Sequence, residues 1–131
     1  MNPVVHFEMP FDDRDRMARF YESAFGWQMH KLGPEMGSYV TAATGPTDAG
    51  GRPALPGTIN GGFFPRKADW PAQLPSVVIA VDDMQAAMRQ VAAAGGSVLG
   101  EPMAIPGIGQ YVSFIDTEQN RVSLLQPLPR G

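Results

Sequence analysis

His6 and Glu8 are the residues whose types and spacing could do acid–base chemistry. They stand two apart in an extended apolar stretch, so a β-strand would project both side chains from one face, about 6–7 Å apart. In a partly desolvated pocket an imidazole and a carboxylate shift each other's pKa and can act as an acid–base pair. The alternative is that they only hydrogen-bond to each other or to neighbouring strands. The other histidine, His30, precedes a Gly-Pro turn and is predicted to be a solvated surface residue.

Composition excludes several other kinds of site. The chain has no cysteine, which rules out disulfides, thiolate nucleophiles and cysteine-ligated zinc. With two histidines, a metal shell would need carboxylates as well. Ten Lys and Arg against thirteen Asp and Glu give a net charge of −3, and the basic residues are scattered, so nucleic acid is not an expected partner. No targeting leader or bilayer-length apolar run is found, so we expect a cytoplasmic location and no membrane partner.

An internal repeat organises the 131 residues. Residues 4–13 and 76–83 are both extended apolar runs that end in an Asp-Asp pair, and each is followed by apolar residues at helical spacing. The Asp pairs supply N-cap carboxylates, while Gly26 and the Gly95-Gly96 pair are expected to end the helices. Short strands are predicted after each helix, at residues 27–31, 38–43 and 58–64, and at residues 97–99, 110–115 and 121–126.

These elements predict an α+β fold of two βαβββ modules within a single domain, residues 1–131. Module one spans about residues 1–65 and module two about residues 76–127, with a proline-containing linker at about 66–75.

Together the motifs resemble the vicinal oxygen chelate superfamily, which includes glyoxalase I, extradiol dioxygenases and bleomycin-resistance proteins. The resemblance covers nearly the whole chain. It is carried by Val5-His6-Phe7-Glu8 with Asp12-Asp13, Phe20-Tyr21-Glu22-Ser23-Ala24-Phe25-Gly26-Trp27, Asn60-Gly61-Gly62-Phe63-Phe64-Pro65, Val81-Asp82-Asp83, Ala94-Gly95-Gly96, Gly107-Ile108-Gly109 and Asp116-Thr117-Glu118-Gln119-Asn120. It implies a curled, cup-shaped mixed sheet around a metal, with one ligand on the first and one on the last strand of each module. It also implies a homodimer.

Carrying the family's ligand positions onto this chain matches one of the four. His6 stands at the first position, whereas alignment of the modules places Ser76, Gly61 and Ser123 at the others. Hydroxyls and a glycine do not replace the imidazole and carboxylate donors that offset the dehydration of a divalent ion. The chain is therefore predicted to resemble the bleomycin-resistance branch, which binds small molecules without a metal, and to need no cofactor.

The predicted partner is a small, at least partly apolar organic molecule held in the cup. Gly61 and Gly62 are adjacent in the strand predicted at residues 58–64, which indicates either close approach of a ligand or a bulge that bends the sheet. The acid–base pair would be His6 and Glu8, with His6 the metal ligand if a metal binds. The predicted ligand-binding residues are Asn60, Gly61, Ser76, Tyr111, Ser113 and Ser123.

Two other functions stay open. One is a metal-dependent lyase, isomerase or dioxygenase with a divalent metal as its cofactor. Its ligand set would be rebuilt from His6, Glu8 and a carboxylate such as Glu101 or Glu118, supplied within the chain or across a dimer. The other is a structural module whose cup is filled by Met and Phe side chains.

Overall fold

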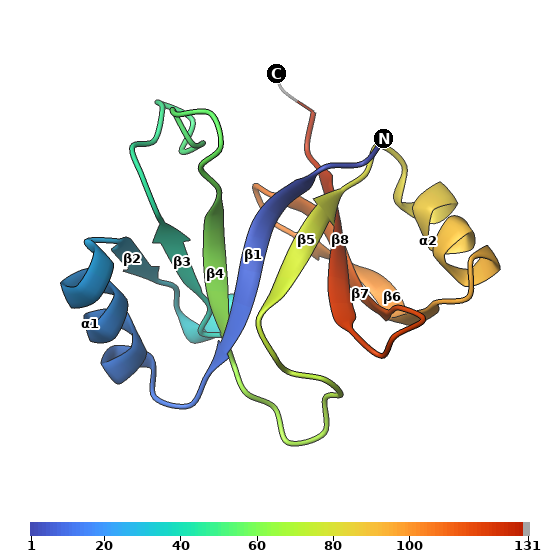
Figure 1. The fold of residues 1–131 in the computed structure, drawn as a ribbon, viewed down its shortest axis with the longest axis horizontal. Coiled ribbons are helices and arrows are strands. Elements are labelled where there is room, and N and C mark those ends of the chain that lie inside the picture. The colour runs from blue at the N-terminus through green and yellow to red at the C-terminus, as the bar shows by residue number, and fades with distance from the viewer. Residues whose placement is uncertain (130–131) are drawn as a thin grey trace. The chain divides into compact units, whose positions relative to one another are not determined.

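The chain forms two compact units, which a computed structural model describes over residues 1–129 (Figure 1). One unit runs from His6 to Pro75, and the other joins residues 1–5 to the chain from Ser76 onward. Each has one α-helix and four strands in βαβββ order, as the repeat predicted. The cup that the two modules would form together stays a prediction.

Module one follows the predicted order of elements. It comprises β1 (Val4–Phe11), α1 (Arg14–Phe25), β2 (Gln28–Lys31), the short 3₁₀ helix η1 (Pro34–Met36), β3 (Val40–Ala43) and β4 (Asn60–Pro65). Its strands lie in the order β2-β3-β4-β1. The β1–β4 pair is parallel and the other pairs are antiparallel, so both β1 and β4 end at the same edge as the start of α1.

Module two repeats the pattern, and its last three strands are longer than those of module one. It comprises β5 (Ser76–Ala80), α2 (Met84–Ala93), β6 (Ser97–Ile105), β7 (Gly109–Ile115) and β8 (Arg121–Pro127). The order is β5-β8-β7-β6, with β5 and β8 parallel. The predicted strand at 97–99 was too short, because β6 continues past a register shift between Leu99 and Met103. Pro102 is tolerated there because β6 is paired on one side only within this module.

The helix ends are set by local chemistry that the sequence predicted. The Asp13 carboxylate accepts a hydrogen bond from the Arg16 amide at 3.0 Å, and Asp83 accepts one from Ala86 at 3.1 Å. Gly26 ends α1 in the left-handed conformation, φ 72°. Among residues 1–129, neither α-helix has the length and apolar character that a bilayer crossing requires.

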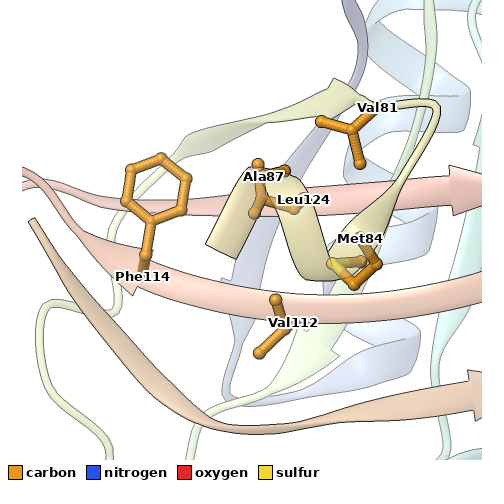
Figure 2. Packing of buried hydrophobic residues seen from close by; sticks show 6 residues of the cluster. All are labelled: Val81, Met84, Ala87, Val112, Phe114 and Leu124. Carbon is orange, nitrogen blue, oxygen red and sulfur yellow. The ribbon is translucent and has the colours of Figure 1, made fainter. Parts of the chain in front are cut away.

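Each helix covers one face of its own sheet. In module two, the α2 residues Met84 and Ala87 pack with Val112, Phe114 and Leu124 (Figure 2). In module one the buried residues of the cluster are Phe11, Val40, Ala42 and Phe63. Because strand side chains alternate, the residues between these core positions lie on the face opposite the helix. That opposite face carries most of the predicted site residues.

The predicted linker packs as a loop on module one. Arg66 donates its backbone N–H to the Phe11 carbonyl at 3.0 Å and its Nε to Asp12 at 3.0 Å. The Arg66 guanidinium also donates to the Gln73 carbonyl at 3.1 Å. These bonds place residues 66–75 with the compact unit that ends at Pro75.

Candidate functional site

Three polar side chains meet on the face of the module-one sheet that α1 does not cover. The Tyr39 hydroxyl donates to the Glu8 carboxyl oxygen Oε2 at 3.2 Å and lies 3.3 Å from His6 Nε2. His6 and Glu8 project from the same face of β1, as predicted, while Tyr39 comes from the residue before β3. Since the Tyr39 hydroxyl donates to Glu8, a hydrogen bond across the 3.3 Å contact takes its proton from His6 Nε2, and the Tyr39 oxygen accepts it.

That proton arrangement leaves the His6 Nδ1 lone pair as an acceptor. Among residues 1–129, Tyr39 is the one hydrogen-bond partner of the His6 ring. Glu8 is 5% exposed, although it carries a carboxyl group. The trio therefore presents a directed chain of hydrogen bonds from an available imidazole nitrogen to a buried carboxyl group.

Gly62 makes the position of Tyr39 possible. A Cβ at residue 62 would overlap the Tyr39 hydroxyl and the end of its ring. Gly62 of β4 is paired with Glu8 of β1 and with Thr41 of β3, so the tyrosine side chain passes directly over it. The group that closely approaches Gly62 is thus the Tyr39 side chain of the same module.

Burial decides the charge of His6. Desolvation lowers the pKa of the imidazole from 6.5 to about 4, so the ring is neutral at pH 7. A group with this pKa is a weak general base at neutral pH, since proton transfer is most efficient when the pKa lies near the working pH. The pKa therefore favours a hydrogen-bonding role for His6 over proton abstraction.

We expect His6 to make folding pH-dependent. Its folded-state pKa is below the unfolded value, so its contribution to stability is complete above pH 6.5 and is lost as pH falls toward about 4. The loss should reach roughly 1–3 kcal/mol. Urea unfolding at pH 7.5, 5.5 and 4 measures it, and NMR titration of the His6 ring gives the pKa directly.

The control for this pH dependence is His6→Gln, which removes the titrating ring but keeps a polar side chain. Carboxyl groups also titrate at the acid end of this range, so the informative quantity is the difference between the wild type and the variant. Equal pH dependence of the two proteins, or a His6 pKa near 6.5, would contradict the expected burial. The chain has two histidines, so the variant His30→Gln is used to identify the NMR signals of the exposed His30 ring.

The register of the parallel strands changes the prediction for Gly61. Val78 pairs with Ser123 in module two and Glu8 pairs with Gly62 in module one, so the counterpart of Ser123 is Gly62 and not Gly61. A Cβ at Gly61 would meet the Phe7 ring on the α1 side of the sheet. Alignment of the modules by sequence was off by one residue, and such a shift exchanges the two faces of a strand.

Asn60 has a role within module one. Its amide oxygen accepts from the Thr44 backbone N–H at 3.3 Å, and its nitrogen donates to the Gly51 carbonyl at 3.4 Å. These bonds tie the long loop between β3 and β4 to the start of β4. Its predicted ligand-binding role stays a prediction.

Three of the predicted module-two residues form a second cluster, on the face opposite α2. The Tyr111 hydroxyl lies 2.8 Å from Ser123 Oγ, and Ser113 Oγ lies 3.0 Å from Ser123 Oγ. Ser113 is 4% exposed and Ser123 is 2% exposed, so these hydroxyls satisfy one another in a buried setting. Ser76 begins β5 and shares the face of Val78 by alternation. Binding of a ligand by these four residues stays a prediction.

Within the one chain described, strong metal donors do not gather around His6 and Glu8. No group of three or more His, Cys, Asp or Glu side chains comes together among residues 1–129. His6 and Glu8 therefore lack a third strong donor, and neither Glu101 on β6 nor Glu118 in the β7–β8 turn joins them in such a group. A divalent ion needs more imidazole or carboxylate donors than this set supplies.

Sequence reasoning missed Tyr39 and the contribution of Gly62. The alternation of Val40 and Ala42 in a predicted strand already placed Tyr39 on the face opposite the core. What it did not predict is that Tyr39 would reach two strands across, to β1. That contact depends on the β3-β4-β1 order and on the missing side chain at Gly62.

Comparison with known sequences gives two kinds of match. The family described as "Bleomycin resistance protein-like N-terminal" matches residues 4–45. The proteins named "Putative glyoxylase CFP32" from Mycobacterium bovis and Mycobacterium tuberculosis are each 31% identical over 130 residues, which cover 97% of this chain and 45% of theirs. The chain thus spans about half the length of these relatives.

Solved structures confirm the fold. Methylmalonyl-CoA epimerase from Streptomyces coelicolor superposes with a TM-score of 0.70 at 17% identity, covering 98% of this chain and 99% of that one. The Mycobacterium tuberculosis epimerase gives a TM-score of 0.68 at 15% identity, covering 96% and 88%. At these identities the similarity concerns the fold alone, which is glyoxalase-like.

Proposed function

The chain belongs to the vicinal oxygen chelate superfamily, the glyoxalase and bleomycin-resistance group, and we propose that it binds a small organic molecule without a tightly held metal ion. The binding group is His6, Tyr39 and Glu8 on the face of the module-one sheet opposite α1. The ligand carries a hydrogen-bond donor that meets His6 Nδ1 and a partly apolar body.

The observation that carries this proposal is the direction of the hydrogen bonds. His6 donates through Nε2 to Tyr39, and Tyr39 donates to Glu8, so the imidazole is held as a neutral acceptor. Polar groups that are fixed in this way cost little further ordering when a ligand binds. Because the pKa of His6 is lowered to about 4, the ligand is bound by an uncharged ring.

Neighbouring residues offer contact to an apolar ligand body. Pro10 and Phe64 pair in the β1–β4 register and lie on the same face as Glu8 by alternation. Both are half-buried. Binding sites for small molecules commonly combine such apolar walls with a few placed polar groups.

The residues at the superfamily's four metal-ligand positions support a degenerate metal site. In module one His6 keeps the family's first-strand position, but the counterpart on the last strand is Gly62, which offers no side-chain donor. In module two the corresponding residues are Ser76 and Ser123, whose neutral hydroxyls are weak ligands for a divalent ion. The chain therefore keeps the fold of its superfamily with a ligand set suited to hydrogen bonding.

A fragment-binding experiment tests the proposed site. We expect phenol and benzamide, titrated into ¹⁵N-labelled protein, to shift the amide signals of Glu8, Tyr39 and Gly62. Tyr39→Phe should weaken this binding about five- to tenfold, because a hydrogen bond in the chain is worth about 1–1.5 kcal/mol. The matched control is Tyr21→Phe, since the Tyr21 hydroxyl faces Met9 on the α1 side of the sheet.

Two results would overturn the proposal. One is the absence of shifts on this face with both probes, or shifts that Tyr39→Phe leaves unchanged. The other is a stoichiometric divalent metal in protein purified without chelator, measured by elemental analysis and lost in His6→Ala. The second result would establish a metal site that includes His6 and would favour the metal-dependent lyase, isomerase or dioxygenase alternative.

A further inference from the structure

A groove of about 800 Å³ lies at the edge of module one where β1 and β4 end. The chain lines it with the ends of these strands, the segment from Lys31 to Ser38 and the start of the loop after β4. None of His6, Glu8 and Tyr39 lines it. The groove is therefore distinct from the proposed binding site, and its position follows the general preference of ligands for the carboxyl ends of parallel strands.

Charge in the groove is mainly positive. Arg14, Lys31 and Lys67 line it, with Asp12 as the one acidic lining residue. Two of these charges are already paired: Lys31 forms an ion pair with Asp15 at 2.6 Å, and Asp12 forms one with Arg66 at 3.0 Å. Arg14 and Lys67 make no ion pair among residues 1–129.

The two unpaired cations are both positioned by neighbouring groups. Arg14 Nη1 donates to the Leu32 carbonyl at 3.2 Å, which orients the guanidinium and leaves its other N–H groups available. The Lys67 ammonium lies 5.9 Å from the centre of the Trp70 ring, a cation–π distance. Both residues thus present charge to the groove without the full cost of ordering a free side chain.

The remaining lining is apolar or small. Phe11, Leu32, Pro34 and Pro65 supply apolar surface. Ser38 lines the groove in the left-handed conformation, φ 55°, which is uncommon for a residue other than glycine. Its hydroxyl is available as a further donor, since no hydrogen bond to it occurs among the described residues.

We propose that this groove binds a small organic anion, a phosphate or carboxylate group attached to an apolar body. The Arg14 guanidinium contacts the anionic head through its planar N–H groups, and Lys67 adds a second positive charge. The apolar body lies against the Phe11, Leu32 and proline surface. The Glu35 carboxylate lies over Gly33, which lines the groove. Its negative charge opposes the binding of an anion.

Phenyl phosphate and benzoate are the probes for this site, with benzyl alcohol as the neutral analogue and benzylamine as the cationic one. We expect both anions to shift the ¹⁵N–¹H signals of Leu32, Gly33 and Gly37, and the neutral and cationic analogues to bind at least tenfold more weakly. Arg14→Gln and Lys67→Gln should each weaken anion binding about fivefold, and 0.5 M NaCl should weaken it further. The matched control is Arg19→Gln, which removes the same charge from an exposed site on α1 outside the groove.

The variant Glu35→Gln tests whether the groove prefers a negatively charged ligand. Removing this carboxylate should strengthen anion binding about two- to threefold and should weaken the binding of benzylamine. Benzylamine binding that equals phenyl phosphate binding, or anion binding that Arg14→Gln and Lys67→Gln leave unchanged, would overturn the proposal. Tyr39→Phe should not alter binding in the groove, so the failure of this inference and the failure of the proposed function are separable.

Discussion

Gly62→Ala is expected to displace the Tyr39 hydroxyl from its place between His6 and Glu8. The new methyl group would occupy the space that the end of the tyrosine ring now fills, so the side chain must rotate away. Glu8, 5% exposed, then loses a hydrogen-bond donor. We expect a loss of about 1–3 kcal/mol in the free energy of unfolding, measured by urea denaturation.

The cluster of His6, Glu8 and Tyr39 should also change in Gly62→Ala. Without the tyrosine ring over this face, His6 becomes more hydrated, and its pKa should rise from about 4 toward 6.5 in an NMR titration. Binding of phenol and benzamide should fall by at least the five- to tenfold expected for Tyr39→Phe. An unchanged His6 pKa would show that Tyr39 keeps its position and that Gly62 is not required for the site.

Two other glycines of module one serve as controls for Gly62→Ala. Gly61→Ala should also destabilise, by about 1–3 kcal/mol, because its Cβ meets the Phe7 ring in the core. It leaves the opposite face intact, so the His6 pKa should stay near 4. Gly45→Ala should be close to neutral for both measurements, since a Cβ there would make only an ordinary 3.6 Å contact with Thr58.

Phe63→Ala is expected to have the largest effect on stability in module one. Phe63 is 1% exposed, and its ring lies 5.2 Å from Tyr21 and 6.2 Å from Phe7, measured between ring centres. Truncation removes apolar contact and leaves a cavity under α1. A loss of about 3–5 kcal/mol in the free energy of unfolding is expected.

The control for Phe63→Ala is the same substitution on the surface. Phe20 lies on α1 and is 58% exposed, so Phe20→Ala should cost less than about 1 kcal/mol. The two variants are compared by urea denaturation at pH 7.5. Equal losses would contradict the assignment of Phe63 to the core. Because Phe63 follows Gly62 in β4, Phe63→Ala should also reduce phenol binding through a less ordered strand.

The repeated modules could be predicted because their signals are local. An Asp-Asp pair before apolar residues at helical spacing specifies an N-cap and an amphipathic helix wherever it occurs. Asp13 and Asp83 accordingly cap α1 and α2. The alternation in β1 likewise placed His6 and Glu8 on one face, where the structure has them.

The lengths and partners of the strands were harder to predict from the sequence. The sequence predicted a strand at residues 97–99, whereas hairpin pairing with β7 carries β6 to Ile105. Pairing energy comes from residues distant in the sequence, so a local pattern does not report it. The same reason explains the shift from Gly61 to Gly62 as the counterpart of Ser123.

The sequence by itself determined the βαβββ repeat, the position of His6 in the first strand, and the scarcity of imidazole ligands. Only the tertiary structure decided that Tyr39 crosses Gly62 to join His6 and Glu8, and that burial makes His6 a neutral acceptor. The physical reason is that side-chain alternation is a property of one strand. A hydrogen bond across three strands depends on their order, their register and the space that one glycine leaves open.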